Sequence, residues 1–424
     1  MRKLFTKCLD FEKPWDIDVY ISKQGGYRSP KKSLSMEPSA IIDEVKKSNL
    51  RGRGGAGFPT GLKWSFLPKD SEAPKYLVIN ADEGEPGTFK DRLILEFDPH
   101  RLLEGCITAC YTLGAHVCYI YIRGELRQCH ARVEEAIAQA RSRGFLGEGI
   151  FGTKYDLEIY VHTGAGAYIC GEETALLESL EGKAGKPRMK PPFPAVVGLF
   201  GCPTIINNVE TIACIPTIIN DGGEAFAADG CERNGGIKLY GISGHSARPG
   251  MYEAPQGISM RELIYGDDFG RGIREGRELK GVIPGGSSCP CILPADIDVA
   301  MDFDSLRKVN SLFGTGGLIL MDDQTCMVRV AATLATFYHI ESCGQCTPCR
   351  EGTGWLKRVL DNIEAGTGTP KDLALLKDVC DNIAGNTICP HGDAASMAVG
   401  SYLRHFMPEF EAHVERGGCW FPEW

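Results

Sequence analysis

The chain has 424 residues, of which 43% are hydrophobic and 24% charged, and its formal net charge is −9. This length allows two or three domains, and the composition is that of an ordinary globular protein. The negative charge argues against nucleic-acid binding. Residues 1–7 lack the apolar core of a signal peptide, and no apolar run approaches the length of a membrane span. We therefore expect a chain without direct membrane insertion, either cytoplasmic or held at a membrane through a partner.

Eighteen cysteines are many for this length. Without a secretion signal, a disulfide framework is not expected, so clustered cysteines point to metal or cluster ligation. Most of the others, such as Cys106, Cys118 and Cys214, lie in apolar segments. These are expected to be small core residues.

After a polar arm over residues 1–35, the pattern predicts a helix from Pro38 that runs into a glycine-rich stretch, residues 50–66. Five glycines leave few side chains there, so a flat or phosphorylated ligand can lie directly on the backbone. Gly52-x-Gly54-x-x-Gly57 matches the dinucleotide fingerprint, but it follows a helix and not the strand that this fingerprint requires. The stretch therefore predicts a ligand cradle of another kind; a flexible linker is the alternative.

Strands are expected at residues 76–79, 116–122 and 157–161, with helices starting at Asp98-Pro99 and covering 125–143. Strands that alternate with helices indicate a parallel sheet with helices packed on it. Acidic residues crowd the turn at 80–92 that follows the first strand. Such a turn is expected to face water or a ligand.

A second glycine loop, residues 163–174, joins the third strand to a helix, which is the right context for a phosphate or flavin site. It resembles a P-loop, yet Glu172-Glu173 replace the Lys-Ser/Thr pair, and these acids would repel a nucleoside triphosphate. Acids at a helix start also stabilise the helix dipole, which is the structural alternative for this pair.

Two later segments suggest ligand contacts. Residues 182–194 carry four basic residues among prolines, either as a clamp over an anionic ligand or as a surface connector. The adjacent amides of Asn207 and Asn208 suit the donor and acceptor edges of a heterocycle.

Beyond residue 237 the pattern changes to a small α+β region and then, over the last hundred residues, to helices near 324–340, 350–364, 371–384 and 393–413. Their number and spacing predict a four-helix bundle.

Cys343, Cys346 and Cys349 lie at two-residue intervals on one loop, and Cys389 is followed by proline. Three cysteines plus a remote Cys-Pro are typical of a [4Fe–4S] cluster. Zinc usually takes two separated pairs of ligands, so zinc is the weaker alternative, and a chance arrangement is the third. A one-electron cluster needs a supply of electrons, and the two glycine cradles could hold a hydride donor and a flavin.

Together, the motifs at 52–66, 80–92, 164–174, 190–193, 207–211 and 343–349 with Cys389 closely resemble the NADH-binding flavoprotein subunit of respiratory complex I. The resemblance extends from about residue 25 to the C-terminus. It implies an α/β chain with three domains: an N-terminal arm and Rossmann-like FMN/NADH domain (1–236), a ubiquitin-like β-grasp domain (237–322) and a four-helix bundle with a [4Fe–4S] cluster (323–424).

Transferred position by position, the resemblance implies three sets of contacts. The FMN contacts would be Gly52, Gly54, Lys63, Asn80, Asp82, Gly171, Glu172, Asn207, Asn208 and Thr211. The NADH contacts would be Gly55, Ala56, Phe58, Phe66, Glu85, Tyr168, Glu173, Lys190 and Phe193, with Thr315 as a further candidate. The cluster ligands would be Cys343, Cys346, Cys349 and Cys389.

Within these sets the resemblance implies roles. Phe58, Phe66 and Phe193 would enclose the adenine, Trp64 would belong to the core, and Glu85 would lie at the nicotinamide end. Glu85 and Lys63 are the candidates for a catalytic role. Gly84, where a serine is frequent, and His391 are mild departures that remove no binding group.

The implied activity is hydride transfer from NADH to FMN, then single-electron transfer to the cluster, in an NADH:quinone oxidoreductase. The implied partners are a thioredoxin-like [2Fe–2S] subunit and a larger iron–sulfur subunit, in a peripheral arm on the cytoplasmic side of the inner membrane. A diaphorase subunit of an NAD-dependent hydrogenase or formate dehydrogenase uses the same core and is the nearest alternative. A non-catalytic iron–sulfur scaffold is a more distant one.

Overall fold

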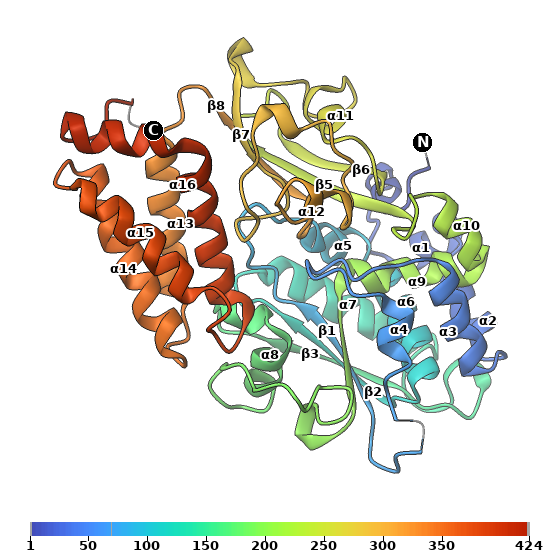
Figure 1. Cartoon of the computed structure of the whole chain (residues 1–424). Helices are drawn as coiled ribbons and strands as arrows, with labels where there is room; N and C mark the ends of the chain where they lie inside the picture. Colours follow the sequence, from blue (N-terminus) through green and yellow to red (C-terminus); the bar gives the residue numbers. More distant parts are fainter. Residues whose placement is uncertain (1, 69, 422–424) are drawn as a thin grey trace. The chain divides into compact units, whose positions relative to one another are not determined.

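A computed structural model describes residues 2–68 and 70–421 of the chain (Figure 1). The chain divides into two compact units. The first unit comprises Met1–Gly84, Phe89–Tyr240 and Met251–Gly257, and the second comprises Glu85–Thr88, Gly241–Gly250 and Ile258–Trp424. The three-domain division expected from the sequence stays a prediction.

The first unit is built on a four-stranded sheet in the order β3-β2-β1-β4, in which every neighbouring pair is parallel. The strands are β1 (Tyr76–Ala81), β2 (Val117–Ile122), β3 (Glu158–Thr163) and β4 (Thr204–Asn208). The parallel sheet predicted from the alternating pattern is confirmed. Because β2 and β4 lie on opposite sides of β1, the strand order reverses between β1 and β4. Ligands of open parallel sheets bind at such a reversal, outside the carboxyl ends of the strands.

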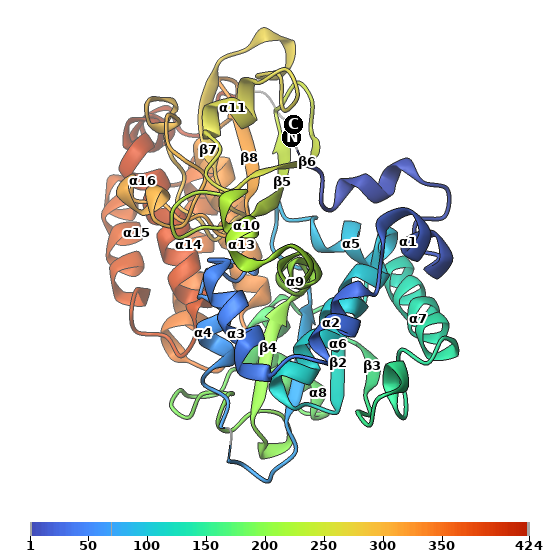
Figure 2. The same cartoon turned by 90° about the vertical axis from the view of Figure 1, so that its right-hand side faces the viewer.

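Helices connect and cover these strands (Figure 2). They are α3 (Pro38–Lys47), α4 (Thr60–Trp64), α5 (Asp91–Phe97), α6 (Pro99–Leu113), α7 (Arg127–Ser142), α8 (Glu173–Leu180), α9 (Val209–Asp221) and α10 (Gly223–Ala228). The apolar residues of α6 and α9, among them Leu102, Cys106 and Ile212, are fully buried against the sheet and each other. The predicted helix at Asp98-Pro99 is confirmed, although the Asp98 side chain pairs with Arg101 (2.8 Å) and does not cap the helix.

The N-terminal residues are more ordered than the predicted arm. They form η1 (Thr6–Asp10), α1 (Ile17–Gln24) and α2 (Arg28–Ser33). Phe5, Tyr20 and Tyr27 are buried in the core of the first unit, where Glu104 on α6 accepts hydrogen bonds from the Tyr27 and Ser29 backbone amides. A single buried carboxylate thus orders the start of α2, which composition alone does not reveal.

The second sheet has the order β6-β5-β8-β7 and is mixed, because β8 is parallel to β5 and antiparallel to β7. Its strands are β5 (Ile237–Gly244), β6 (Gly250–Pro255), β7 (Leu279–Ile283) and β8 (Gly317–Asp322). Two short helices, α11 (Met260–Tyr265) and α12 (Ser305–Lys308), lie between them in the chain. The expected small α+β region is present.

The C-terminal part of the second unit is helical, as the sequence predicts. It contains α13 (Met327–Glu341), α14 (Thr347–Glu364), α15 (Pro370–Ile383) and α16 (Pro390–Arg416), which pack side by side (Figure 1). Leu376, Val379 and Ile383 form the buried face of α15. Among the described residues, no helix combines the length and apolar character that a membrane crossing requires.

The close approach of α6 and α9 depends on Gly105, where an added Cβ would lie 2.2 Å from the Ile212 carbonyl oxygen. We expect Gly105→Ala to lower the free energy of unfolding by about 1–3 kcal/mol through overpacking, despite the better helix propensity of alanine. Gly400→Ala on α16 is the matched control, because a Cβ there meets nothing within 4 Å. It should be neutral or stabilising by up to about 1 kcal/mol. Denaturant unfolding of both variants tests this, and equal effects would contradict it.

Candidate functional site

The first glycine stretch lies against the carboxyl end of β4. The Arg53 amide donates to Thr211 Oγ1 (2.8 Å), and a Cβ on Gly54 would lie only 3.1 Å from Asn208 Cβ. The stretch closes on itself through a Gly52 N–H to Phe58 carbonyl bond (2.9 Å), and Gly55 has a positive φ of 116°. The stretch starts after α3 and leads into α4, so the rejection of an ordinary dinucleotide fingerprint is confirmed.

The second glycine loop reaches the carboxyl end of the neighbouring strand. Asn80 near the end of β1 donates through Nδ2 to the Gly171 carbonyl (2.8 Å), and a Cβ on Gly171 would lie 3.4 Å from the Asp82 carbonyl oxygen. Asn80 is also the register partner of Asn208 on β4. The two glycine loops therefore converge where the strand order reverses.

Glu172 is the N-cap of α8, since its carboxylate accepts from the amides of Thr174 (2.8 Å) and Ala175 (3.1 Å). The structural role considered for this acid is thus present. Tyr168 starts the short helix η3 (Tyr168–Gly171) just before it.

The paired amides already have protein partners. Trp64 is buried, as expected, and its indole N–H donates to Asn207 Oδ1 (2.9 Å). Asn208 Oδ1 accepts from the Glu210 amide at the start of α9 (3.0 Å), and its Nδ2 donates to Asp91 (2.7 Å). These contacts fix both side chains in place before any ligand binds.

A buried charge network lies beside Asn208. Lys90 Nζ contacts Asn208 Oδ1 (3.0 Å), Asp91 (2.7 Å) and Glu210 (3.1 Å), and Lys238 Nζ contacts Glu210 (2.9 Å). Burial opposes ionisation of Glu210, but Lys238, Lys90 and Arg53 outweigh it and lower the pKa of Glu210 to about 2. The sequence did not indicate this network, because its members lie far apart in the chain.

The acidic turn after β1 was expected to face water or a ligand. This expectation is wrong for Glu83 and Asp91, which are both buried. Glu83 is 6% exposed and accepts from the Asp91 amide (2.6 Å) and the Arg92 Nε (2.8 Å). Burial raises the pKa of Glu83. Glu83 and Asp91 are therefore internal groups that stabilise the turn.

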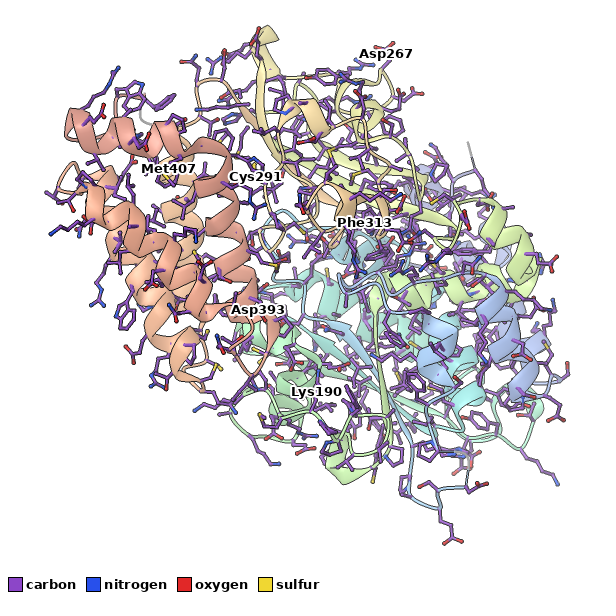
Figure 3. All side chains as sticks on the ribbon, viewed as in Figure 1. Lys190, Asp267, Cys291, Phe313, Asp393 and Met407 are labelled. Atoms are coloured by element: carbon purple, nitrogen blue, oxygen red, sulfur yellow. The ribbon has the colours of Figure 1, made fainter. Side chains whose placement is uncertain are left out.

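Two lysines pair with Glu173 of the second loop, and three exposed aromatic rings belong to the first glycine stretch and the basic loop. Glu173 pairs with Lys63 (3.1 Å) and with Lys190 (2.9 Å), the latter labelled in Figure 3. Burial opposes ionisation of Glu173, yet the two lysines lower its pKa. Phe58 (45% exposed) and Phe66 (52%) are 5.9 Å apart between ring centroids, and Phe193 is 58% exposed. Aromatic rings with this exposure are available for stacking on a ligand.

The basic loop at 182–194 contains no helix or strand, as predicted. Arg188 is occupied internally, with bonds to Glu178, Glu181 (2.8 Å) and the Gly198 carbonyl (2.9 Å). Arg188 thus anchors the loop on α8, and Lys190 is the basic residue that reaches Glu172 and Glu173.

Glu85 and Thr315 belong to the second unit. Glu85 Oε1 accepts from the Ser288 amide (2.7 Å) and from Ser287 Oγ (3.3 Å). The Thr315 hydroxyl lies 2.5 Å from that of Thr88.

Cys343 lies between α13 and α14, whereas Cys349 lies in the first turn of α14. The expectation that all three clustered cysteines share one loop is therefore wrong for Cys349. Cys346 is the N-cap of α14, and Cys389 is the N-cap of α16. Gly344 takes a left-handed conformation (φ 74°) and its carbonyl accepts from Arg350 (2.9 Å), which closes the loop. Burial raises the pKa of the Cys349 thiol to about 11. Helix N-termini favour thiolates, so two of the four thiols are placed where an anionic ligand is stabilised.

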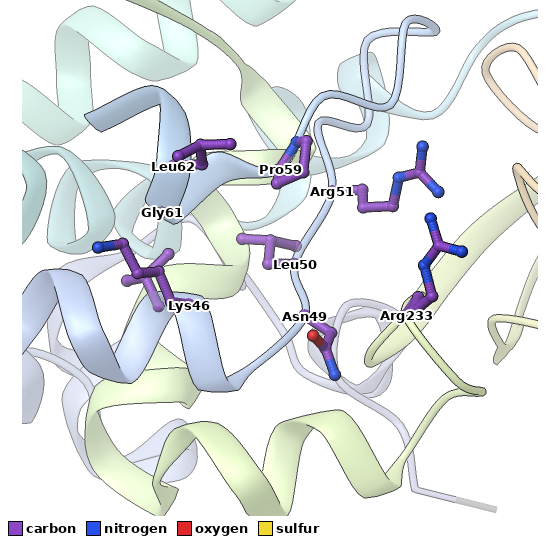
Figure 4. A pocket seen from close by; sticks show the side chains of 9 residues that line it. Lys46, Asn49, Leu50, Arg51, Pro59, Gly61, Leu62 and Arg233 are labelled. Atoms are coloured by element: carbon purple, nitrogen blue, oxygen red, sulfur yellow. The ribbon is translucent and has the colours of Figure 1, made fainter. Parts of the chain in front are cut away.

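A cavity of about 220 Å³ lies between residues of α3, the first glycine stretch and Arg233 (Figure 4). Leu50, Arg51, Pro59, Leu62 and Arg233 are among its lining residues. None of the predicted FMN or NADH contacts lines it.

The residues present fit the implied groups. Gly54 and Gly171 let the backbone of the two loops pack closely against Asn208 and Asp82 at the strand ends, where backbone amides can bind a flat or phosphorylated molecule. Lys90, Lys238 and Arg53 lie in the buried network beside them, together with the acids Glu210, Asp91 and Glu83. Cys343, Cys346 and Cys349 follow one another in the connection to α14 and in its first turn, and Cys389 lies at the start of α16; these four thiols fit an iron–sulfur cluster.

Two family models match the chain. Residues 45–217 match the Nuo51 FMN-binding domain. Residues 329–413 match the NADH-ubiquinone oxidoreductase-F iron-sulfur binding region. Both implied cofactors, FMN and the [4Fe–4S] cluster, are thereby supported by separate parts of the chain.

Two similar proteins match the sequence over nearly the whole length of this chain. An F-type subunit of the NADH-quinone oxidoreductase of Rhizobium meliloti (strain 1021) is 54% identical over 398 residues, 94% of each chain. The F-type subunit of the same enzyme in Streptomyces coelicolor is 49% identical over 412 residues, 97% of this chain and 91% of the relative.

Among solved structures, an NAD+-reducing [NiFe]-hydrogenase in the H2-reduced state is similar with a TM-score of 0.83 and 32% sequence identity. The match covers 97% of this chain and 67% of the hydrogenase chain. The α/β class, with a parallel sheet, a mixed sheet and C-terminal helices, is therefore confirmed. The chain belongs to the family of F-type subunits of NADH-quinone oxidoreductase, the NADH-oxidising subunits of complex I that carry FMN and a [4Fe–4S] cluster.

Proposed function

We propose that FMN and NADH bind over the carboxyl ends of β1 and β4, on the two glycine loops that converge there. The observation that carries this proposal is the pair of contacts, Gly54 against Asn208 and Asn80 against Gly171, at the point where the strand order reverses. Small residues at both contacts let backbone amides approach a ligand, as phosphate and flavin sites require.

The FMN side of the site comprises the residues nearest the strand ends. Asn80, Asn207 and Asn208 are held by protein hydrogen bonds, so they present fixed groups to the isoalloxazine. Gly52, Gly54, Asp82, Gly171, Glu172 and Thr211 complete this set, with Lys63 as the cation beside it.

The NADH side comprises the exposed groups. Phe58, Phe66 and Phe193 enclose the adenine, while Gly55 and Ala56 offer backbone. Lys190, Glu173 and Tyr168 bind polar groups of the dinucleotide. Lys190 and Lys63 share Glu173, so binding of a diphosphate would replace one ion pair by another. Glu85, with Thr315, contacts the nicotinamide end.

Cys343, Cys346, Cys349 and Cys389 are the proposed cluster ligands. Their support is the position of the first three around the start of α14, and of Cys346 and Cys389 at helix N-termini. The finer fold assignment, a Rossmann-like domain (1–236), a ubiquitin-like β-grasp domain (237–322) and a four-helix bundle (323–424), is part of the same proposal.

FMN, when bound, accepts a hydride from NADH and releases electrons one at a time, and the cluster carries them onward. The chain itself supplies position and charge. The aromatic side chains would hold the adenine, and the glycine loops would hold the flavin ring against the nicotinamide ring. Lys63 and Glu85 would set the charge beside these two rings. No side chain acts as a nucleophile, so the rate depends on orientation.

The partners are a thioredoxin-like [2Fe–2S] subunit and a larger iron–sulfur subunit, in the arm of complex I on the cytoplasmic side of the membrane. The likeness to a hydrogenase supports a diaphorase role as the second candidate. The higher identity to the F-type subunit of the quinone oxidoreductase, 54% against 32%, favours complex I.

If Phe58 and Phe66 stack on adenine, Phe58→Ala and Phe66→Ala should each raise KM for NADH about 2- to 10-fold, since an aromatic contact contributes about 0.5–1.5 kcal/mol. FMN content should not change. Phe200→Ala is the control, because Phe200 is equally exposed (53%) and lies 5.9 Å from the Tyr76 ring, in a pair of the same spacing. Steady-state NADH:ferricyanide kinetics measure the effect. An unchanged KM in both variants, or the same increase in Phe200→Ala, would remove the aromatic groups from the site.

If Cys346 is a cluster ligand and not part of the flavin site, Cys346→Ala should abolish electron transfer to the cluster while NADH still bleaches the flavin. Iron per chain should fall, and the EPR signal of the reduced cluster should disappear. Cys380→Ala, a buried cysteine on α15, is the control and should keep both. A folded, FMN-loaded Cys346→Ala variant that NADH no longer bleaches would contradict the division between the two sites.

A further inference from the structure

A second group of metal-ligating side chains lies in the second unit, apart from the cysteine loop. Cys326, Glu364, His413 and Cys419 each offer one ligand atom, and these four atoms all lie within 4.8 Å of one another. They come from the N-cap of α13, the last residue of α14, the last turn of α16 and the segment after α16. Cys326 and Cys419 fall outside both ranges matched by the family models. We propose that these four residues bind a zinc ion.

The geometry fits a single tetrahedral ion. Cys326 Sγ lies 3.3 Å from His413 Nε2 and 3.6 Å from Glu364 Oε2, and Nε2 lies 3.6 Å from Oε2. A tetrahedron with zinc bonds of about 2.3 Å to sulfur and about 2.0–2.2 Å to nitrogen and oxygen has edges of about 3.4–3.8 Å. The three separations among Cys326, Glu364 and His413 are therefore within about 0.1 Å of those in a coordination sphere around zinc.

The tautomer of His413 suits a metal ligand. Its Nδ1 lies 2.7 Å from the Glu409 carbonyl oxygen, which can only accept, so Nδ1 carries the proton. Nε2 then directs its lone pair toward Cys326 and Glu364. A backbone carbonyl that orients a histidine in this way is the usual second partner of a zinc-bound imidazole.

The surroundings compensate the charge of the ligand set. Two thiolates and a carboxylate around Zn²⁺ leave one net negative charge, and Arg329 lies beside it. Its Nε donates to Glu364 Oε1 (2.7 Å) and its Nη2 to Cys419 Sγ (3.2 Å), while its amide donates to Cys326 Sγ (3.3 Å). Sulfur ligands exclude Mg²⁺ and Ca²⁺, which prefer oxygen, and four mixed N, O and S ligands are typical of a closed structural zinc site.

The ion would hold the segment after α16 against the ends of three helices. Trp420 follows Cys419 and packs on the His413 ring, with centroids 4.6 Å apart, and Arg416 lies over the Trp420 ring (4.7 Å). The site lies at the start of α13, whereas Cys343 follows its end, so about 20 Å of helix separates them. The ion is therefore structural and not a member of the electron path.

The test uses the full chain purified with its FMN and iron–sulfur cluster. Metal analysis should give one zinc per chain that dialysis does not remove. Zinc-edge X-ray absorption should show two sulfur ligands at about 2.3 Å with two lighter ligands at about 2.0–2.1 Å. Zinc bound by mistake in the cysteine loop would instead show three or four sulfur ligands, which would overturn the assignment.

Variants locate the ion. Cys419→Ser and His413→Gln should each weaken zinc binding at least about tenfold and leave iron and FMN content unchanged. Cys202→Ser is the matched control, a partly exposed cysteine in the first unit that belongs to no such group among the described residues. The proposal is overturned if the zinc content of the parent chain is well below one, if it survives in both variants, if another metal occupies the site, or if mass spectrometry finds a Cys326–Cys419 disulfide.

Discussion

The structure of the first unit depends on one constraint, the convergence of two glycine loops on the carboxyl ends of adjacent parallel strands. Gly54 packs closely on Asn208, where an added Cβ would lie 3.1 Å from the Asn208 Cβ, and the Asn80 to Gly171 bond brings the other loop to the same edge. Two hydrogen bonds fix the first loop: the Trp64 indole N–H donates to Asn207, and the Arg53 amide donates to the Thr211 hydroxyl. A site assembled from backbone in this way would suit the proposed reaction, in which orientation supplies most of the catalysis.

The charged groups near this edge form two sets that differ in burial. In the first set, Lys90 and Lys238 are buried and compensate the buried carboxylate of Glu210, so this set is held by ion pairs that water does not screen. In the second set, Lys63, Lys190 and Glu173 are only partly buried, and such pairs contribute less to stability than buried ones. In the proposed site, this second set is the one that a bound dinucleotide would contact.

Much of this architecture could be predicted from local sequence. Strand–helix alternation indicated the parallel sheet, and apolar spacing indicated α13–α16, because both depend on short-range periodicity. Trp64 was recognised as a core residue. The predictions that were wrong concern residues that meet only in the fold. Glu83 and Asp91 were expected to face solvent or a ligand, yet Glu83 accepts from the Asp91 amide and Asp91 pairs with Lys90 inside the protein. The group around Cys326 and Cys419 was missed for the same reason, since no spacing pattern links four residues spread over the C-terminal hundred.

The central claim is that FMN occupies the edge formed by β1 and β4. An experimental structure of the chain loaded with FMN and NADH tests it most directly. We predict flavin density in contact with Gly54, Asn80 and Asn208, and adenine density between Phe58 and Phe66. Flavin density in the cavity lined by Leu50, Pro59 and Arg233, or at any place away from these strand ends, would contradict this claim.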